Sequence, residues 1–131
     1  KNYAVPGMFV QANHVDVRLY SGVYELDKEQ LQSLREYIAD HSDQLNALIG
    51  DSAFTKHFGS IRGDQNKRVS KELMPAAAAQ PLILHKNFYY FTSWSPSILL
   101  QDDLITRIME RYQIATPLNE YMLQGIFPDM Y

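Results

Sequence analysis

Apolar and polar residues alternate in the first part of the chain. Within residues 15–20, valine or leucine occupies every second position, and polar or aromatic side chains stand between them. This period of two is typical of a strand with one apolar face. Asn13 and His14 are turn-forming residues just before it. We therefore predict a hairpin that joins residues 8–12 to residues 15–20.

Residues 86–94 predict another strand, and this one carries aromatic side chains on both faces. Phe88 and Tyr90 fall on one face, and Tyr89 and Phe91 fall on the other. Such a pattern is typical of a strand that is covered on both sides. The chain offers few elements to cover two faces, so we expect the remaining aromatic face to be an interface.

Helical spacing of apolar residues begins after Asp27. Gln30 stands three residues further on, as a capping box requires. The apolar stripe then continues through Leu31, Leu34, Ile38, Leu45 and Leu48. We predict that His41 and Ser42 divide this run into two helices, with Ser42 capping the second.

A further helix is predicted over residues 102–112. Pro117 is expected to interrupt it, because proline lacks the N–H that the helix ladder needs. Residues 118–123 continue an apolar face, and we expect the tail from Gly125 to be loosely held. The order of elements predicts an α+β fold, a mostly antiparallel sheet with helices packed on a face, as a single domain over residues 1–131.

Composition narrows the possible functions. The chain has 131 residues, with 12 Lys plus Arg against 15 Asp plus Glu. The net charge of -3 argues against nucleic acid as a partner, because that affinity comes mainly from neutralising phosphates. There is no cysteine, so disulfides and thiolate metal sites are excluded.

No apolar run approaches the roughly 20 residues that a membrane helix needs, so we expect no membrane partner and a cytoplasmic location. The histidines lack the spacing of metal ligands. We therefore expect no metal site, and we expect no other cofactor.

Two groups of residues are candidates for a binding site. A titratable and aromatic row on one strand face contains His14, Asp16, Arg18 and Tyr20. A second group is cationic and aromatic, which suits a phosphate or carboxylate, and contains Arg68, Lys71, His85, Lys86 and Tyr89. A solvated sheet face and a solvated basic rim are the alternative interpretations.

Several short motifs follow one another in an order that is typical of one protein family. They are Gly22-Val23-Tyr24, the helix with Leu31, Leu34, Arg35 and Ile38, the turn with Phe54 and Phe58, residues 67–71, the strand with Lys86 and Phe88, and Pro117-Leu118. From about Met8 to Met122 this order resembles the C-terminal half of DUF2461, a bacterial and fungal family of unknown function. Ser70 departs from the family pattern, which has proline there.

The resemblance implies a fold and not a reaction. The family's N-terminal half, rich in polar motifs, has no counterpart in this sequence, and Lys1 corresponds to its last lysine. The resemblance therefore implies that the chain is the C-terminal portion of a larger family domain.

These observations favour a non-enzymatic binding or protein-interaction domain. The expected partner is the missing N-terminal segment, a second copy in a homo-oligomer, or another protein. The alternative is half of an enzyme that acts on an anionic or phosphorylated ligand, so whether the protein is an enzyme stays open.

Overall fold

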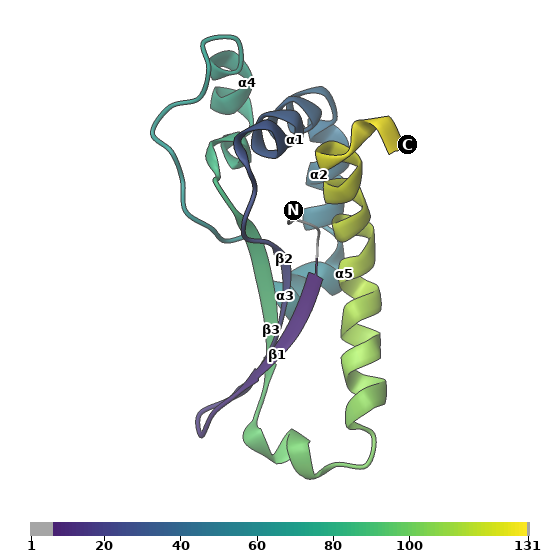
Figure 1. Ribbon diagram of the computed structural model, residues 1–131. Coiled ribbons are helices and arrows are strands. Elements are labelled where there is room, and N and C mark those ends of the chain that lie inside the picture. The colour runs from purple at the N-terminus through teal and green to yellow at the C-terminus, as the bar shows by residue number, and fades with distance from the viewer. Residues whose placement is uncertain (1–6, 131) are drawn as a thin grey trace.

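A three-stranded antiparallel sheet forms one layer of the molecule, in the order β1-β2-β3. The computed structural model describes residues 7–130 (Figure 1). The strands are β1 (Gly7–Ala12), β2 (Val17–Val23) and β3 (Phe88–Trp94). In this register Tyr20 of β2 lies between Phe9 of β1 and Phe91 of β3. The predicted α+β class is confirmed.

Helices cover one face of this sheet (Figure 1). They are α1 (Lys28–Asp40), α2 (Ser42–Ile49), α3 (Ser52–Phe58), α4 (Met74–Ala79) and α5 (Leu104–Ile126), with short 3₁₀ helices η1 (Pro81–Leu84), η2 (Pro96–Leu100) and η3 (Pro128–Met130). α3 and α5 contact the strands directly, and α1 and α2 contact α5. We call the helix-covered side of the sheet the inner face and the opposite side the outer face.

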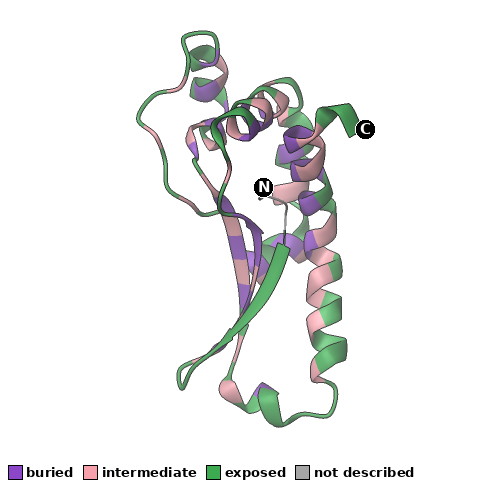
Figure 2. Cartoon of the chain, in the orientation of Figure 1, coloured by how far each residue is buried: buried purple, intermediate pink, exposed green. Residues whose placement is uncertain are grey.

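The hydrophobic core lies between the inner face and the helices. The buried residues from the strands are Val17, Leu19, Val23, Phe88 and Tyr90, and the helices contribute Leu34, Ile38, Leu45, Phe54, Phe58, Leu118 and Met122. Figure 2 shows this burial where β2 and β3 meet the helices, whereas β1 is exposed along its whole length. β1 is therefore held mainly by its pairing with β2.

A chain of buried polar groups crosses this core. Tyr90 donates its hydroxyl hydrogen bond to Asn119 Oδ1, and Asn119 Nδ2 donates to Ser21 Oγ at 2.9 Å. Ser21 Oγ in turn donates to the carbonyl of Gly7 at 2.9 Å. The chain thus links β3, α5, β2 and β1 in one network.

The predicted hairpin is present, but its turn is longer than expected. Residues 13–16 form the loop, and β2 begins at Val17, so the prediction of a strand from Val15 is wrong. The Asn13 side chain accepts hydrogen bonds from the backbone N–H of Val15 at 2.8 Å and of Asp16 at 3.0 Å. This Asx-type turn competes with strand pairing and leaves Val15 68% exposed.

The capping box and the helix division are confirmed. Asp27 Oδ1 accepts from the N–H of Gln30 at 2.8 Å, and Gln30 Oε1 accepts from the N–H of Asp27 at 3.0 Å. His41 separates α1 from α2. The predicted cap at Ser42 is wrong, because Ser42 is already helical and its hydroxyl accepts from Gln80 Nε2 at 2.9 Å.

The C-terminal part differs most from expectation. α5 continues through Pro117, because buried side chains on both sides of it, such as Ala115 and Leu118, hold the helix against the core. The prediction of a loose tail from Gly125 is wrong for its first residues, since Gly125 and Ile126 belong to α5 and are buried. A Cβ on Gly125 would lie 2.6 Å from Leu34 Cδ1, so glycine lets α5 approach α1 closely.

Candidate functional site

The outer face of the sheet is an aromatic surface. Phe9 and Tyr20 stack with ring centroids 5.0 Å apart and planes within 9°. Tyr20 also contacts Phe91 at 5.1 Å, and Tyr24 stacks on Tyr89 at 5.2 Å. Alternation along each strand puts the rings of Phe9, Tyr20, Tyr89 and Phe91 on one side, and the strand register brings them together. Tyr24 follows directly after β2.

Two guanidinium groups lie against the Phe91 ring. The Cζ of Arg18 lies 4.4 Å from the ring centroid and the Cζ of Arg62 lies 4.6 Å from it. Both distances are in the range of cation–π attraction. A backbone bridge holds Arg62 beside β3, with its N–H 2.7 Å from Tyr89 O and its carbonyl 2.9 Å from Tyr89 N.

The two arginines differ in their charge partners. Arg18 Nε donates to Asp16 Oδ2 at 3.0 Å, and Arg18 Nη1 donates to Tyr20 Oη at 3.0 Å. The hydrogen bond to Tyr20, followed by the one to Asp16, raises the pKa of Arg18. Among residues 7–130, Arg62 has no carboxylate within ion-pair distance, so its charge faces solvent.

We define the aromatic outer face as Phe9, Arg18, Tyr20, Tyr24, Arg62, Tyr89 and Phe91. None of these side chains is fully buried, and Phe9 is 51% exposed. The rings contact one another, and these contacts account for part of their burial. Burial within the cluster raises the pKa of Tyr24 to about 12.

The structure gathers part of the first predicted group at this surface. Arg18 and Tyr20 share the outer face with Tyr89, whose ring centroid lies 6.4 Å from that of Tyr20. Asp16 belongs to the hairpin loop and joins the group through its ion pair with Arg18. His14 is exposed in the same loop, at the end of the hairpin.

The second predicted group is divided: Tyr89 lies on the aromatic outer face, whereas its cations and His85 lie elsewhere. Arg68 and Lys71 are exposed in the segment that leads to α4, which is at the end of the molecule opposite the hairpin loop (Figure 1). Lys86 is exposed, and its N–H donates to Asp64 O at 2.7 Å. Among the predicted cations, only Arg18 belongs to the aromatic outer face.

His85 is the buried member of the second group. Its Nε2 lies 3.3 Å from Gln65 Nε2, and its Nδ1 lies 3.2 Å from the Asn87 carbonyl. The amide nitrogen of Gln65 must donate, so Nε2 accepts and Nδ1 carries the proton of a neutral ring. Burial lowers the pKa of His85 accordingly. The ring lines a cavity of about 350 Å³ beside Gln80 and Leu82.

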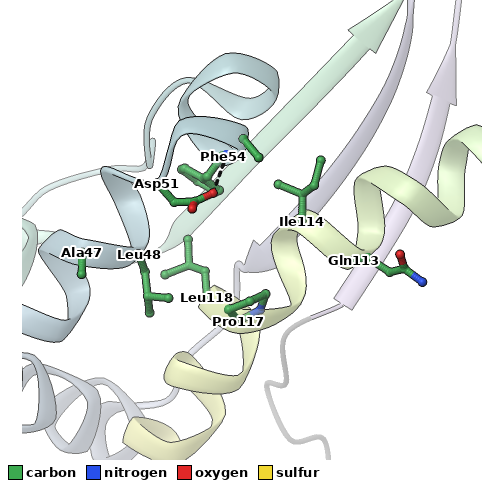
Figure 3. A pocket seen from close by; sticks show the side chains of 9 residues that line it. Ala47, Leu48, Asp51, Phe54, Gln113, Ile114, Pro117 and Leu118 are labelled. Carbon is green, nitrogen blue, oxygen red and sulfur yellow. Dashed lines mark hydrogen bonds between the residues drawn. The ribbon is translucent and has the colours of Figure 1, made fainter.

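Another cavity, of about 330 Å³, lies between α2, α3 and α5 (Figure 3). Leu48, Phe54 and Ile114 make much of its wall apolar. The carboxylate of Asp51 is already used, because it accepts from the N–H of Phe54 at 3.2 Å as the cap of α3. This cavity therefore offers a largely apolar space with few polar groups available to bind a ligand.

Sequence reasoning missed several members of the aromatic outer face as site residues: Phe9, Tyr24, Arg62 and Phe91. Phe91 has the same strand parity as Tyr89, so the period of two contained its signal. Arg62 had no local signal, because its position depends on the bridge to Tyr89 across a long stretch of sequence.

Metal and membrane chemistry can be assessed for the same residues. Within residues 7–130, no three His, Asp or Glu side chains are grouped so that they could hold a metal ion. None of the described helices combines the length and the apolar character needed to cross a membrane.

The fold and the site define an α+β domain with a three-stranded antiparallel sheet, helices on its inner face and an aromatic outer face. The sequence model of DUF2461, described as a conserved hypothetical protein, matches residues 1–121. The chain belongs to this family, as its motifs predicted. No curated protein matches the chain. No solved structure matches it either.

Proposed function

We propose that this protein is a non-enzymatic binding domain that engages another protein through its aromatic outer face. The observation that carries the proposal is a cluster of tyrosine, phenylalanine and arginine side chains on the face of the sheet that the described helices leave open (Figure 1). These residue types are enriched at the centres of protein interfaces, and open aromatic patches are typical of binding surfaces.

The ring geometry favours a protein over a nucleic acid as the partner. Phe9 stacks on Tyr20, Tyr24 stacks on Tyr89, and Phe91 receives two guanidinium groups. Each of these rings thus already contacts a neighbouring ring or guanidinium group, whereas bases bind single-stranded readers by stacking on open ring faces. The net charge of -3 supports the same conclusion.

A photo-crosslinking amino acid in place of Tyr89 tests the proposal in cells, with the same amino acid in place of Ile105 as control. Ile105 is 70% exposed on α5, on the helical side of the molecule. We expect a protein adduct from position 89 only. Equal adducts from both positions would contradict the proposal.

The captured protein is then purified and its Kd for the domain is measured. We expect Phe91→Ala and Arg62→Ala each to raise Kd by about 10- to 100-fold, the range of interface hot spots. Ile105→Ala should leave Kd unchanged. An unchanged Kd for Phe91→Ala and Arg62→Ala would sink the proposal.

The charge of Arg62, which has no carboxylate partner among residues 7–130 and lies on the same ring as Arg18, favours one alternative. We propose, second, half of an enzyme that holds a phosphorylated ligand between these guanidinium groups. Hydrolysis of an aryl phosphate by the pure chain, lost in Arg62→Gln, would support this alternative. Absence of both hydrolysis and phosphate binding at millimolar concentration would contradict it.

A further inference from the structure

The free edge of β1 leads to an inference beyond the proposed function. Asn13 N–H donates to Asp16 O at 3.0 Å, so residues 13 and 16 form a hydrogen-bonded pair at the end of the hairpin. Bonded and non-bonded pairs alternate along an antiparallel ladder. The backbone amides of Met8, Val10 and Ala12 therefore point away from β2, in the plane of the sheet and toward its free edge.

Across the sheet, β3 obeys the same alternation. Tyr89 lies opposite Gly22 but turns its own N–H and carbonyl away from β2 to Arg62. The segment around Arg62 thus covers the first part of the β3 edge, and Ser95-Pro96 ends the strand. Within residues 7–130, no hydrogen bond reaches the outward amides of β1.

β1 lacks the features that usually protect an edge strand. Its sequence, GMFVQA, contains no charged residue and no proline. Met8 is 39% exposed, Phe9 51% and Val10 46%, so neither face of the strand is shielded. Natural edge strands avoid pairing with other chains by using charges, proline, bulges or covering segments.

We infer that β1 pairs with β1 of a second copy of this chain, antiparallel and about a two-fold axis at Val10. This register brings outward amides face to face, with Val10 opposite its counterpart and Met8 opposite Ala12 of the second copy. The result is a continuous six-stranded sheet, made of two copies of the observed three-stranded one.

The charges near the edge are compatible with a second copy. β1 itself is neutral, so the pairing brings no like charges into contact. Among residues 7–130, Asp16 and Arg18 are the charged residues closest to β1 in the sequence, and they form an ion pair at 3.0 Å. A six-residue strand pair is smaller than a standard interface of about 800 Å² per partner, so the dimer is weak, with a Kd of about 10–100 µM.

The absence of cysteine in the chain makes the test direct. Single-cysteine variants of the full chain are treated with a short bis-maleimide at about 200 µM protein, above the expected Kd. We expect dimeric product from Val10→Cys and little from two controls. Val15→Cys places the thiol in the hairpin loop, and Ser93→Cys places it on the open part of the β3 edge.

Sedimentation equilibrium of the wild type and of Val10→Lys gives the second readout. We expect the wild type to dimerise and Val10→Lys to raise its Kd by at least about tenfold, because the two lysines would face each other on the axis. If Val10→Lys fails to fold, the cross-linking result decides. A monomeric wild type at about 200 µM, a dimer that Val10→Lys leaves unchanged, or equal cross-linking from Ser93→Cys would each overturn the inference.

Discussion

Removal of the Asn119 side-chain amide is the sharpest test of how the sheet is attached to α5. Asn119 Oδ1 accepts from the Tyr90 hydroxyl, and Asn119 Nδ2 donates to Ser21 Oγ at 2.9 Å. Tyr90 is fully buried, Ser21 is 2% exposed and Asn119 8%. Asn119→Leu keeps the volume of the side chain but leaves the Tyr90 hydroxyl without its partner.

The expected cost follows from desolvation. A buried polar group without a hydrogen bond costs about 1–3 kcal/mol, so Asn119→Leu should lower the free energy of unfolding by that amount. Tyr90→Phe should cost about as much, because it leaves Asn119 Oδ1 unpaired. It keeps the ring contacts of Tyr90 with Phe54 and Phe58. The double variant lacks both the Tyr90 hydroxyl and Asn119 Oδ1, so neither is left unpaired. Its loss in free energy of unfolding should therefore be smaller than the sum of the two single losses by about 1–3 kcal/mol.

Urea unfolding followed by fluorescence of Trp94, the one tryptophan of the chain, measures all four proteins. The m-value should stay constant, which shows that the same surface is exposed on unfolding. Additivity of the two single variants within about 0.5 kcal/mol would refute the network. Ser33→Ala is a suitable control, because Ser33 Oγ bonds to the Gly125 carbonyl, away from this network.

Three further predictions concern stability. Gly125→Val should cost about 1–3 kcal/mol in urea unfolding, because its Cβ would lie 2.6 Å from Leu34 Cδ1; a neutral result would contradict the close approach of α1 and α5. Asp27→Ala should cost about 1 kcal/mol, whereas Asp43→Ala, in a first turn without a side-chain cap, should cost less; equal costs would argue against the capping box. Burial lowers the pKa of His85 from 6.5 in the folded chain. Between the folded-state pKa and 6.5, the unfolded chain therefore binds a proton at His85 that the folded chain does not bind. Unfolding free energy should therefore decrease as pH falls below 6.5 and level off below the folded-state pKa, and a pH series on His85→Gln should show a smaller decrease.

Local signals predicted local structure well. The capping box at Asp27 and Gln30 was readable because both of its hydrogen bonds join residues three apart. The division near His41 and the strand that ends at Trp94 could be predicted for the same reason. Hydrophobic periodicity and structure-breaking residues act over only a few positions.

Predictions failed where distant contacts decide the outcome. Proline is a strong local signal, yet α5 passes through Pro117 because Ala115 and Leu118 are buried on either side of it. Likewise, the tail residue Gly125 is ordered by contacts with Leu34 and Tyr37 of α1, far away in the sequence. Helix propensity is a weak preference that tertiary packing overrides.

The candidate site combines both kinds of information. The sequence indicated aromatic side chains on both faces of β3, but it could not say which face the helices cover. The pairing with β2 decides this, because Leu19 lies opposite Thr92 and Ser21 opposite Tyr90. The apolar face of β2 carries Val17 and Leu19 and must be buried. Phe88 and Tyr90 therefore turn inward with that face, and Tyr89 and Phe91 are left on the outer face.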